Sequence, residues 1–167
     1  MRLRSICGAA LAATVLAMSA CGGGGGSSPS SQSPSPSSNP TASFTSSFKT
    51  VTGDFKHGSQ VIGQTIGAAK NMTDAQLKTA FKTLTNKWQT VLSKLESLNP
   101  PSNVATDFNT LRDAASRVET DLNAIVSAAS THSASAAQQA SATLVHDILT
   151  AKSAALKIDQ KLGITSG

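Results

Sequence analysis

Beyond residue 43, apolar residues recur every three or four positions in four separate runs. This spacing places side chains on one face of an α-helix, and no run has the period of two that is typical of a strand. The pattern predicts four helices, over residues 43–70, 74–98, 102–129 and 134–162. Because the connections are short, neighbouring helices should be antiparallel, and the expected fold is an all-α, up-down-up-down four-helix bundle.

Sequence signals mark several helix ends. Thr73 and Gln76 have the spacing of a capping box at the start of the second helix, and two consecutive prolines follow its end. Ser133 or Thr131 can cap the start of the fourth helix. Gly163 suits a left-handed cap at the end of that helix. These signals agree with the helices that the apolar pattern predicts.

Antiparallel alignment of the four runs predicts a core in which large residues lie beside small ones, as dense packing requires. The alignment places Trp88 level with Gly58, and it places Phe55 level with alanines of the neighbouring helices. Val91 and Ile148 are also expected to face the core, whereas no carboxylate or histidine is. The residues expected at its centre are Gly58, Phe55, Phe81, Trp88 and Phe108.

The charged positions have two interpretations. Lysines flank the apolar stripes of the first two helices, at Lys49, Lys56, Lys70, Lys78, Lys82, Lys87 and Lys94. They are either a solvated face that keeps the bundle soluble, or a basic side that faces anionic lipid head groups or cell-wall polymers. Two ion pairs are expected, between Asp113 and Arg117 within the third helix and between Lys94 and Asp107 across the proline turn.

Several classes of function find no support in the sequence. The formal net charge is +5, but no basic patch with interleaved aromatic residues indicates nucleic-acid binding. The expected core lacks the inward glutamates and the Glu-x-x-His motif of di-metal bundles. His57, His132 and His146 fall on outer or loop positions, and neither a GxSxG nor a CxxCH motif occurs. The expected protein is therefore not an enzyme and has no metal or cofactor site.

The amino-terminal segment follows another pattern. Two arginines precede an apolar run of 13 residues that ends at Met18, which is the length of a signal-peptide core and too short for a membrane span. The order Met18-Ser19-Ala20-Cys21 resembles the lipobox of bacterial lipoproteins, and the composition is similar in style to that of actinobacterial lipoproteins. This resemblance implies removal of residues 1–20, cleavage between Ala20 and Cys21, and a diacylglycerol thioether on Cys21.

Residues 21–42 are dominated by Gly, Ser and Pro, which indicates a flexible tether ahead of a bundle at residues 43–164. Two or more acyl chains on Cys21 would anchor the protein stably. The expected location is therefore the extracytoplasmic face of the cell membrane, or the outer membrane in a host with two membranes.

Two functions remain open for the bundle. The first is a non-enzymatic interaction module that presents a helical face to another envelope protein or to a cell-wall polymer. The second is a sensor or carrier that binds a small ligand or a lipid. An accessible apolar pocket would favour the second function.

Overall fold

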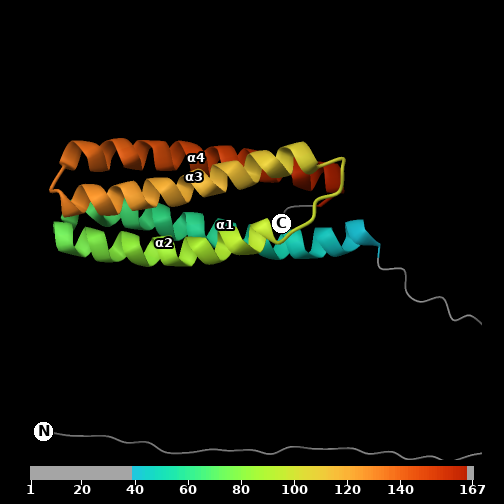
Figure 1. Ribbon diagram of the computed structural model, residues 1–167, viewed down its shortest axis with the longest axis horizontal. Helices are drawn as coiled ribbons and strands as arrows, with labels where there is room; N and C mark the ends of the chain where they lie inside the picture. Colours follow the sequence, from blue (N-terminus) through green and yellow to red (C-terminus); the bar gives the residue numbers. More distant parts are fainter. Residues whose placement is uncertain (1–38, 165–167) are drawn as a thin grey trace, which may run out of the picture. The chain divides into compact units, whose positions relative to one another are not determined.

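The computed structural model describes residues 39–164, and within this range it contains four α-helices and no strand. Figure 1 shows the helices side by side, with consecutive helices antiparallel. The elements are α1 (Pro40–Ala68), a short 3-10 helix η1 (Ala69–Asn71), α2 (Asp74–Glu96), α3 (Ala105–Ser130) and α4 (Ala134–Leu162). The expected all-α four-helix bundle is confirmed. Ala20, Cys21 and most of the expected tether lie outside the described residues.

The capping signals in the sequence produce the expected helix ends. The backbone N–H of Gln76 donates to Thr73 Oγ1, and the Thr73 N–H donates back to Gln76 Oε1, which completes the capping box of α2. The Ser133 hydroxyl accepts from the N–H of Ala136 at the start of α4. Gly163 ends α4 with a φ of 66°, in the left-handed region that favours glycine.

Two expected boundaries are wrong by three residues. Helix α1 begins at Pro40, within the segment assigned to the tether, because Asn39 Oδ1 accepts from the N–H of Thr41 and proline fits the first helical turn. Helix α3 begins at Ala105 and not at residue 102, since the Val104 N–H first closes a turn onto the carbonyl of Pro101. Neither shift changes which helices pair.

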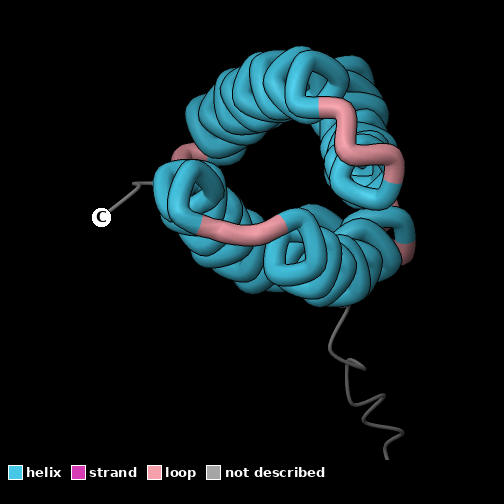
Figure 2. Tube along the Cα trace, turned by 90° about the vertical axis from the view of Figure 1, so that its left-hand side faces the viewer, coloured by secondary structure: helices cyan, strands magenta, loops and turns pink. Residues whose placement is uncertain are grey.

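The helices are not equally spaced around the bundle axis, along which Figure 2 is viewed. The backbones of α3 and α4 approach each other closely, whereas those of α1 and α4 do so at few positions. Alanines allow the close approach, because they carry nothing beyond Cβ. The buried alanines are Ala114, Ala115, Ala128 and Ala129 on α3 and Ala140, Ala151, Ala154 and Ala155 on α4. Helix α1 instead buries three phenylalanines, Phe44, Phe48 and Phe55.

Several core positions differ from the expected set, and Gly58, expected at the centre, is half-buried. On α2, Leu92 is buried while Val91 is half-buried, and on α4 Asp147 is buried while Ile148 is half-buried. The expectation that no carboxylate enters the core is therefore wrong at Asp147. On α2 and α4, each correction moves the buried position by one residue, toward a neighbouring face of the helix.

Trp88 lies at the junction of three helices. Its side chain is 2% exposed, and its Nε1 donates a 2.8 Å hydrogen bond to the carbonyl of Ala115 on α3. Its ring centroid lies 5.1 Å from that of Phe55 on α1. A Cβ on Gly58 would lie 3.3 Å from Trp88 Cζ3, so the absence of a side chain at Gly58 makes room for the ring. Phe81 and Phe108 are also buried.

Gly58→Leu is expected to lower the free energy of unfolding by about 1–3 kcal/mol, although Leu is the better helix former, because its side chain would crowd the Trp88 ring. Trp88→Ala should cost about 3–5 kcal/mol through lost burial and a cavity. The two effects should be non-additive, since the smaller side chain at position 88 leaves room for the leucine. Denaturant melts of both single variants and the double variant measure the coupling.

Gly63→Leu is the matched control, because a Cβ at this exposed position of α1 would meet no atom within 4 Å. It should raise the free energy of unfolding by up to about 1 kcal/mol through helix propensity alone. A Gly58→Leu variant that is as stable as this control, with no coupling to Trp88→Ala, would contradict the packing assigned to Gly58.

Candidate functional site

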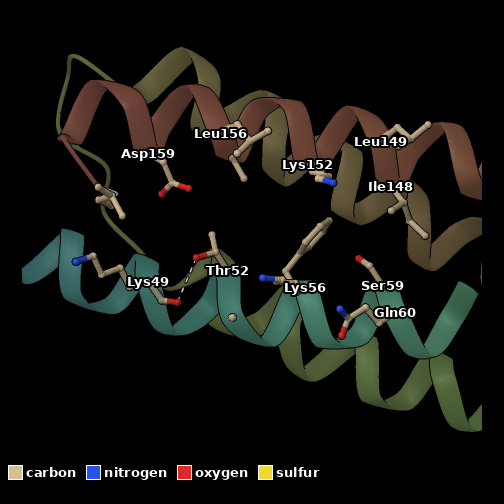
Figure 3. Close-up of a pocket in the computed structure, with 14 residues that line it drawn as sticks. Lys49, Thr52, Lys56, Ser59, Gln60, Ile148, Leu149, Lys152, Leu156 and Asp159 are labelled. Atoms are coloured by element: carbon tan, nitrogen blue, oxygen red, sulfur yellow. Dashed lines mark hydrogen bonds between the residues drawn. The ribbon is translucent and has the colours of Figure 1, made fainter. Parts of the chain in front are cut away.

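A groove runs between α1 and α4 and has a volume of about 710 Å³. Figure 3 shows it in close-up, with the two helices forming opposite walls. Its lining residues are Lys49, Thr52, Gly53, Phe55, Lys56, Ser59 and Gln60 from α1, Ile148, Leu149, Lys152, Ala155, Leu156 and Asp159 from α4, and Ile164. The groove lies at the seam where the backbones of α1 and α4 approach least, so the unequal helix spacing accounts for its position.

The α4 wall of the groove carries exposed apolar side chains. Leu149 is 59% exposed and Leu156 is 44% exposed, and both line the groove. Val145 is 45% exposed and lies four residues before Leu149 on the same helical face, outside the groove lining. Isolated exposed leucines are common on protein surfaces, but a set along one face that borders a groove is typical of a binding surface.

Three lysines line the same groove. Lys56 from α1 and Lys152 from α4 lie on opposite walls in its middle, and Lys49 lies toward one end (Figure 3). Within residues 39–164, no carboxylate forms an ion pair with any of these three lysines. The groove therefore combines an apolar lining with three lysines that are in no ion pair within this range and with one carboxylate, that of Asp159.

Ser59 adds a polar group to the α1 wall. Its Oγ atom is buried and has no hydrogen-bond partner among the described residues. In Figure 3 the side chain of Ser59 extends toward the groove, between Lys56 and Gln60 in the chain. A buried hydroxyl without a partner is unfavourable, so a rotation of the Ser59 side chain that brings Oγ to an acceptor atom of a bound molecule would satisfy it.

A smaller hollow of about 270 Å³ lies on the other side of α1, between α1 and α2. Gly58 and Trp88 are among its lining residues. Helix α1 therefore has open space on both sides, unlike the tightly packed pair of α3 and α4. The larger groove has the exposed apolar wall and is the better candidate for a binding site.

The residues expected from the sequence have different places relative to this groove. Of the five core residues, Phe55 lines it, and its ring also contacts Trp88. Cys21 and Ala20 lie outside the described residues. The sequence analysis missed Leu149, Leu156 and Lys152. The signal that was available is that both leucines are large apolar residues outside the heptad positions of their run.

Neither expected ion pair forms: Asp113 pairs with Arg112 on its own helix at 3.8 Å, and the other residues pair between helices. Arg117 Nε lies 2.9 Å from Asp147 Oδ1 on α4, and not beside Asp113 on its own helix. Lys94 and Asp107, expected to pair with each other, instead have other partners. The observed pairs are Lys94 with Asp54 at 2.8 Å and Lys161 with Asp107 at 2.6 Å. Each joins neighbouring helices, which helical spacing within one element does not reveal.

Asp121 and Asp147 form a pair of neighbouring carboxyl groups at the interface of α3 and α4. Burial raises the pKa of Asp121, and the negative charge of Asp147 raises it further. Thr143 and Arg117 act in the opposite direction with smaller effects. The two carboxyl groups lie outside the groove lining, so they bear on the stability of the bundle and not on the candidate site.

The described residues contain neither a metal centre nor a membrane-crossing helix. Within residues 39–164, no three His, Cys, Asp or Glu side chains are grouped to hold a metal ion. His57, His132 and His146 are exposed, and His132 pairs with Asp74 at the start of α2. In the same range no helix combines the length and the apolar character that a bilayer crossing requires.

Comparisons of the chain with protein-family models, with curated proteins and with solved structures found no match. The fold class is that of an all-α four-helix bundle, and the groove between α1 and α4 is its candidate functional site.

Asp121→Asn is expected to raise the free energy of unfolding at pH 7 and to have less effect at pH 3.5. A raised pKa means that the folded state holds the Asp121 proton more tightly than the unfolded state does. The stability that this tighter proton binding contributes is fully present below pH 3.8, the usual pKa of an aspartate side chain. It is lost as the pH rises through the pKa that Asp121 has in the folded state. Asparagine does not ionise, so the variant does not lose this stability between pH 3.5 and pH 7. Urea melts of both proteins at the two pH values measure the difference.

Asp113→Asn is the control for this measurement, because Asp113 is exposed on the same helix. It should give a smaller change between the two pH values. An effect of Asp121→Asn that is the same at pH 3.5 and pH 7 would contradict the raised pKa of Asp121.

Proposed function

We propose that this chain is an exported, lipid-anchored binding protein whose bundle holds an apolar ligand in the groove between α1 and α4. The observation that carries the proposal is the open groove of about 710 Å³ with Leu149 and Leu156 exposed along its wall. Its volume is within the range of small-molecule sites, about 300–1,000 Å³, and bundles bind ligands between their helices. The proposed activity is non-enzymatic.

The groove favours ligand binding over the other function that the sequence left open, an interaction module for an envelope protein or a cell-wall polymer. A helical face that binds a partner protein needs no concave surface, whereas a small apolar ligand must be enclosed to bury its own surface. Transfer of apolar surface out of water contributes about 25 cal/mol per Å². A ligand in the groove would cover both its own surface and the exposed faces of Leu149 and Leu156.

The anchor in this proposal is Cys21, on the basis of its resemblance to the lipobox cysteine of bacterial lipoproteins. Acyl chains on this residue would hold the protein at the extracytoplasmic face of the cell membrane, or at the outer membrane of a host with two membranes. The segment from residue 22 to residue 38 is rich in Gly, Ser and Pro, the composition from which the sequence predicts a tether. The bundle would then be close to a source of lipids.

Cys21→Ala is expected to abolish lipid attachment and to move the protein from the detergent phase to the aqueous phase in a detergent partition assay, because thiol acylation requires the cysteine. Cys7→Ala is the matched control, since Cys7 lies within the apolar run that processing would remove. It should leave partitioning unchanged. A Cys21→Ala protein that is still retained in the detergent phase would contradict the anchor.

The full chain carrying Cys21→Ala should bind the neutral fluorescent dye Nile red in the groove, with a rise in dye emission. Addition of Leu149→Ser and Leu156→Ser should weaken the dye affinity by about tenfold, because each exchange removes apolar contact area. Both side chains are exposed, so the bundle should stay folded, which circular dichroism checks.

Val145→Ser is the matched control for the dye experiment, because Val145 is equally exposed on α4 but lies outside the groove lining. It should leave the affinity unchanged. The proposed site is wrong if the Cys21→Ala protein with an unchanged groove binds no dye. It is also wrong if Val145→Ser weakens dye binding as much as the two leucine exchanges do.

A further inference from the structure

The middle of the groove is positively charged on both walls. Lys56 on α1 and Lys152 on α4 lie opposite each other, and Lys49 adds a third positive charge toward one end (Figure 3). Asp159 is the one carboxylate in the lining, and it lies toward the same end as Lys49. Because no carboxylate among the described residues forms an ion pair with Lys56 or Lys152, an anion between them would gain attraction without breaking an existing pair.

The hydroxyl of Ser59 is close in sequence to this pair of lysines, one helical turn after Lys56. Its Oγ is buried without a hydrogen-bond partner among the described residues. Together, the two ammonium groups and the hydroxyl offer donors to a carboxylate, which is an acceptor with two oxygens. The lining contains no arginine, so the head group would be held by the point charges of two ammonium groups and by a hydroxyl, without a bidentate fork.

Apolar residues continue from the lysine pair toward both ends of the groove. Ile148 and Leu149 lie toward one end, and Leu156 lies toward the other (Figure 3). Ile164 also lines the groove. The lining of α1 extends over residues 49–60, which corresponds to about 17 Å at the rise of an α-helix. With the head group at this positive centre, the chain would follow the apolar wall toward one end of the groove, so the site fits one alkyl chain that carries a negatively charged head group.

We propose that the groove binds a single-chain carboxylate amphiphile, a fatty-acid anion, with its head group between Lys56 and Lys152 and its chain along the leucine-lined wall. This inference rests on the proposed function, since it names the class of ligand that the groove takes. Attraction to the lysines selects the anion over a neutral amphiphile, and the apolar wall selects an amphiphile over a short carboxylate.

The test uses the full chain carrying Cys21→Ala, so that no acyl chain of the protein itself competes for the groove. Calorimetry compares dodecanoate with dodecanol, dodecyl phosphate, dodecyltrimethylammonium and acetate, with each ionic amphiphile below its micelle concentration and dodecanol below its solubility limit. Trp88 is the single tryptophan of the chain, and it contacts the groove residue Phe55, so its fluorescence reports binding independently. Dodecanoate is expected to bind about tenfold more tightly than dodecanol, and acetate should not bind measurably.

The double variant Lys56→Gln/Lys152→Gln should remove the preference for dodecanoate and leave the affinity for dodecanol unchanged. The matched control is Lys82→Gln/Lys157→Gln, which removes two charges from exposed positions outside the groove lining. It should retain the preference. Because all four lysines are exposed, the exchanges should leave the fold intact.

The outcomes separate the inference from the function on which it rests. Equal affinity for dodecanoate and dodecanol overturns the inference, while dodecanol binding at the groove still supports the proposed function. Tighter binding of dodecyl phosphate than of dodecanoate overturns the assignment to a carboxylate. If no amphiphile binds, both the inference and the proposed function are wrong, and a protein partner becomes the occupant to test.

Discussion

The close packing of α3 against α4 is the constraint on which the rest of the structure depends. Alanines along both helices bring the two backbones together, while α1 is separated from the other helices by buried phenylalanine rings. A bundle with one tight pair and one widely spaced helix cannot close every seam to the same degree. The wider of the two open seams beside α1 lies between α1 and α4, and it is where exposed leucines and unpaired lysines gather.

Phe55 and Trp88 connect this open seam to the core. Phe55 lines the groove and contacts Trp88, whose Nε1 is in turn bonded to the carbonyl of Ala115 on α3. The base of the groove is therefore part of the packed interior, and not a loop that must order before it can bind. A preformed apolar site of this kind avoids the entropy cost of ordering on binding.

The interface of α3 and α4 also contains charge, which its alanine content alone would not suggest. Asp147 is buried there, and Arg117 reaches it from α3 at 2.9 Å. A buried carboxylate is strongly unfavourable when it is left without a partner, so this pair restricts how the two helices can slide past each other. Asp121 lies beside the same pair, where its own burial and then the negative charge of Asp147 raise its pKa.

The sequence by itself determined the number of helices, their antiparallel order and most of their caps, because apolar period and capping chemistry are local properties of the chain. It also placed Trp88 beside Gly58, where a large and a small residue had to match. Only the tertiary structure decided that Arg117 pairs with Asp147, that Lys56 faces Lys152, and that the α1–α4 seam stays open. These features depend on the distance and rotation between helices, which the summed volumes of all core side chains set together and which no single run of residues encodes.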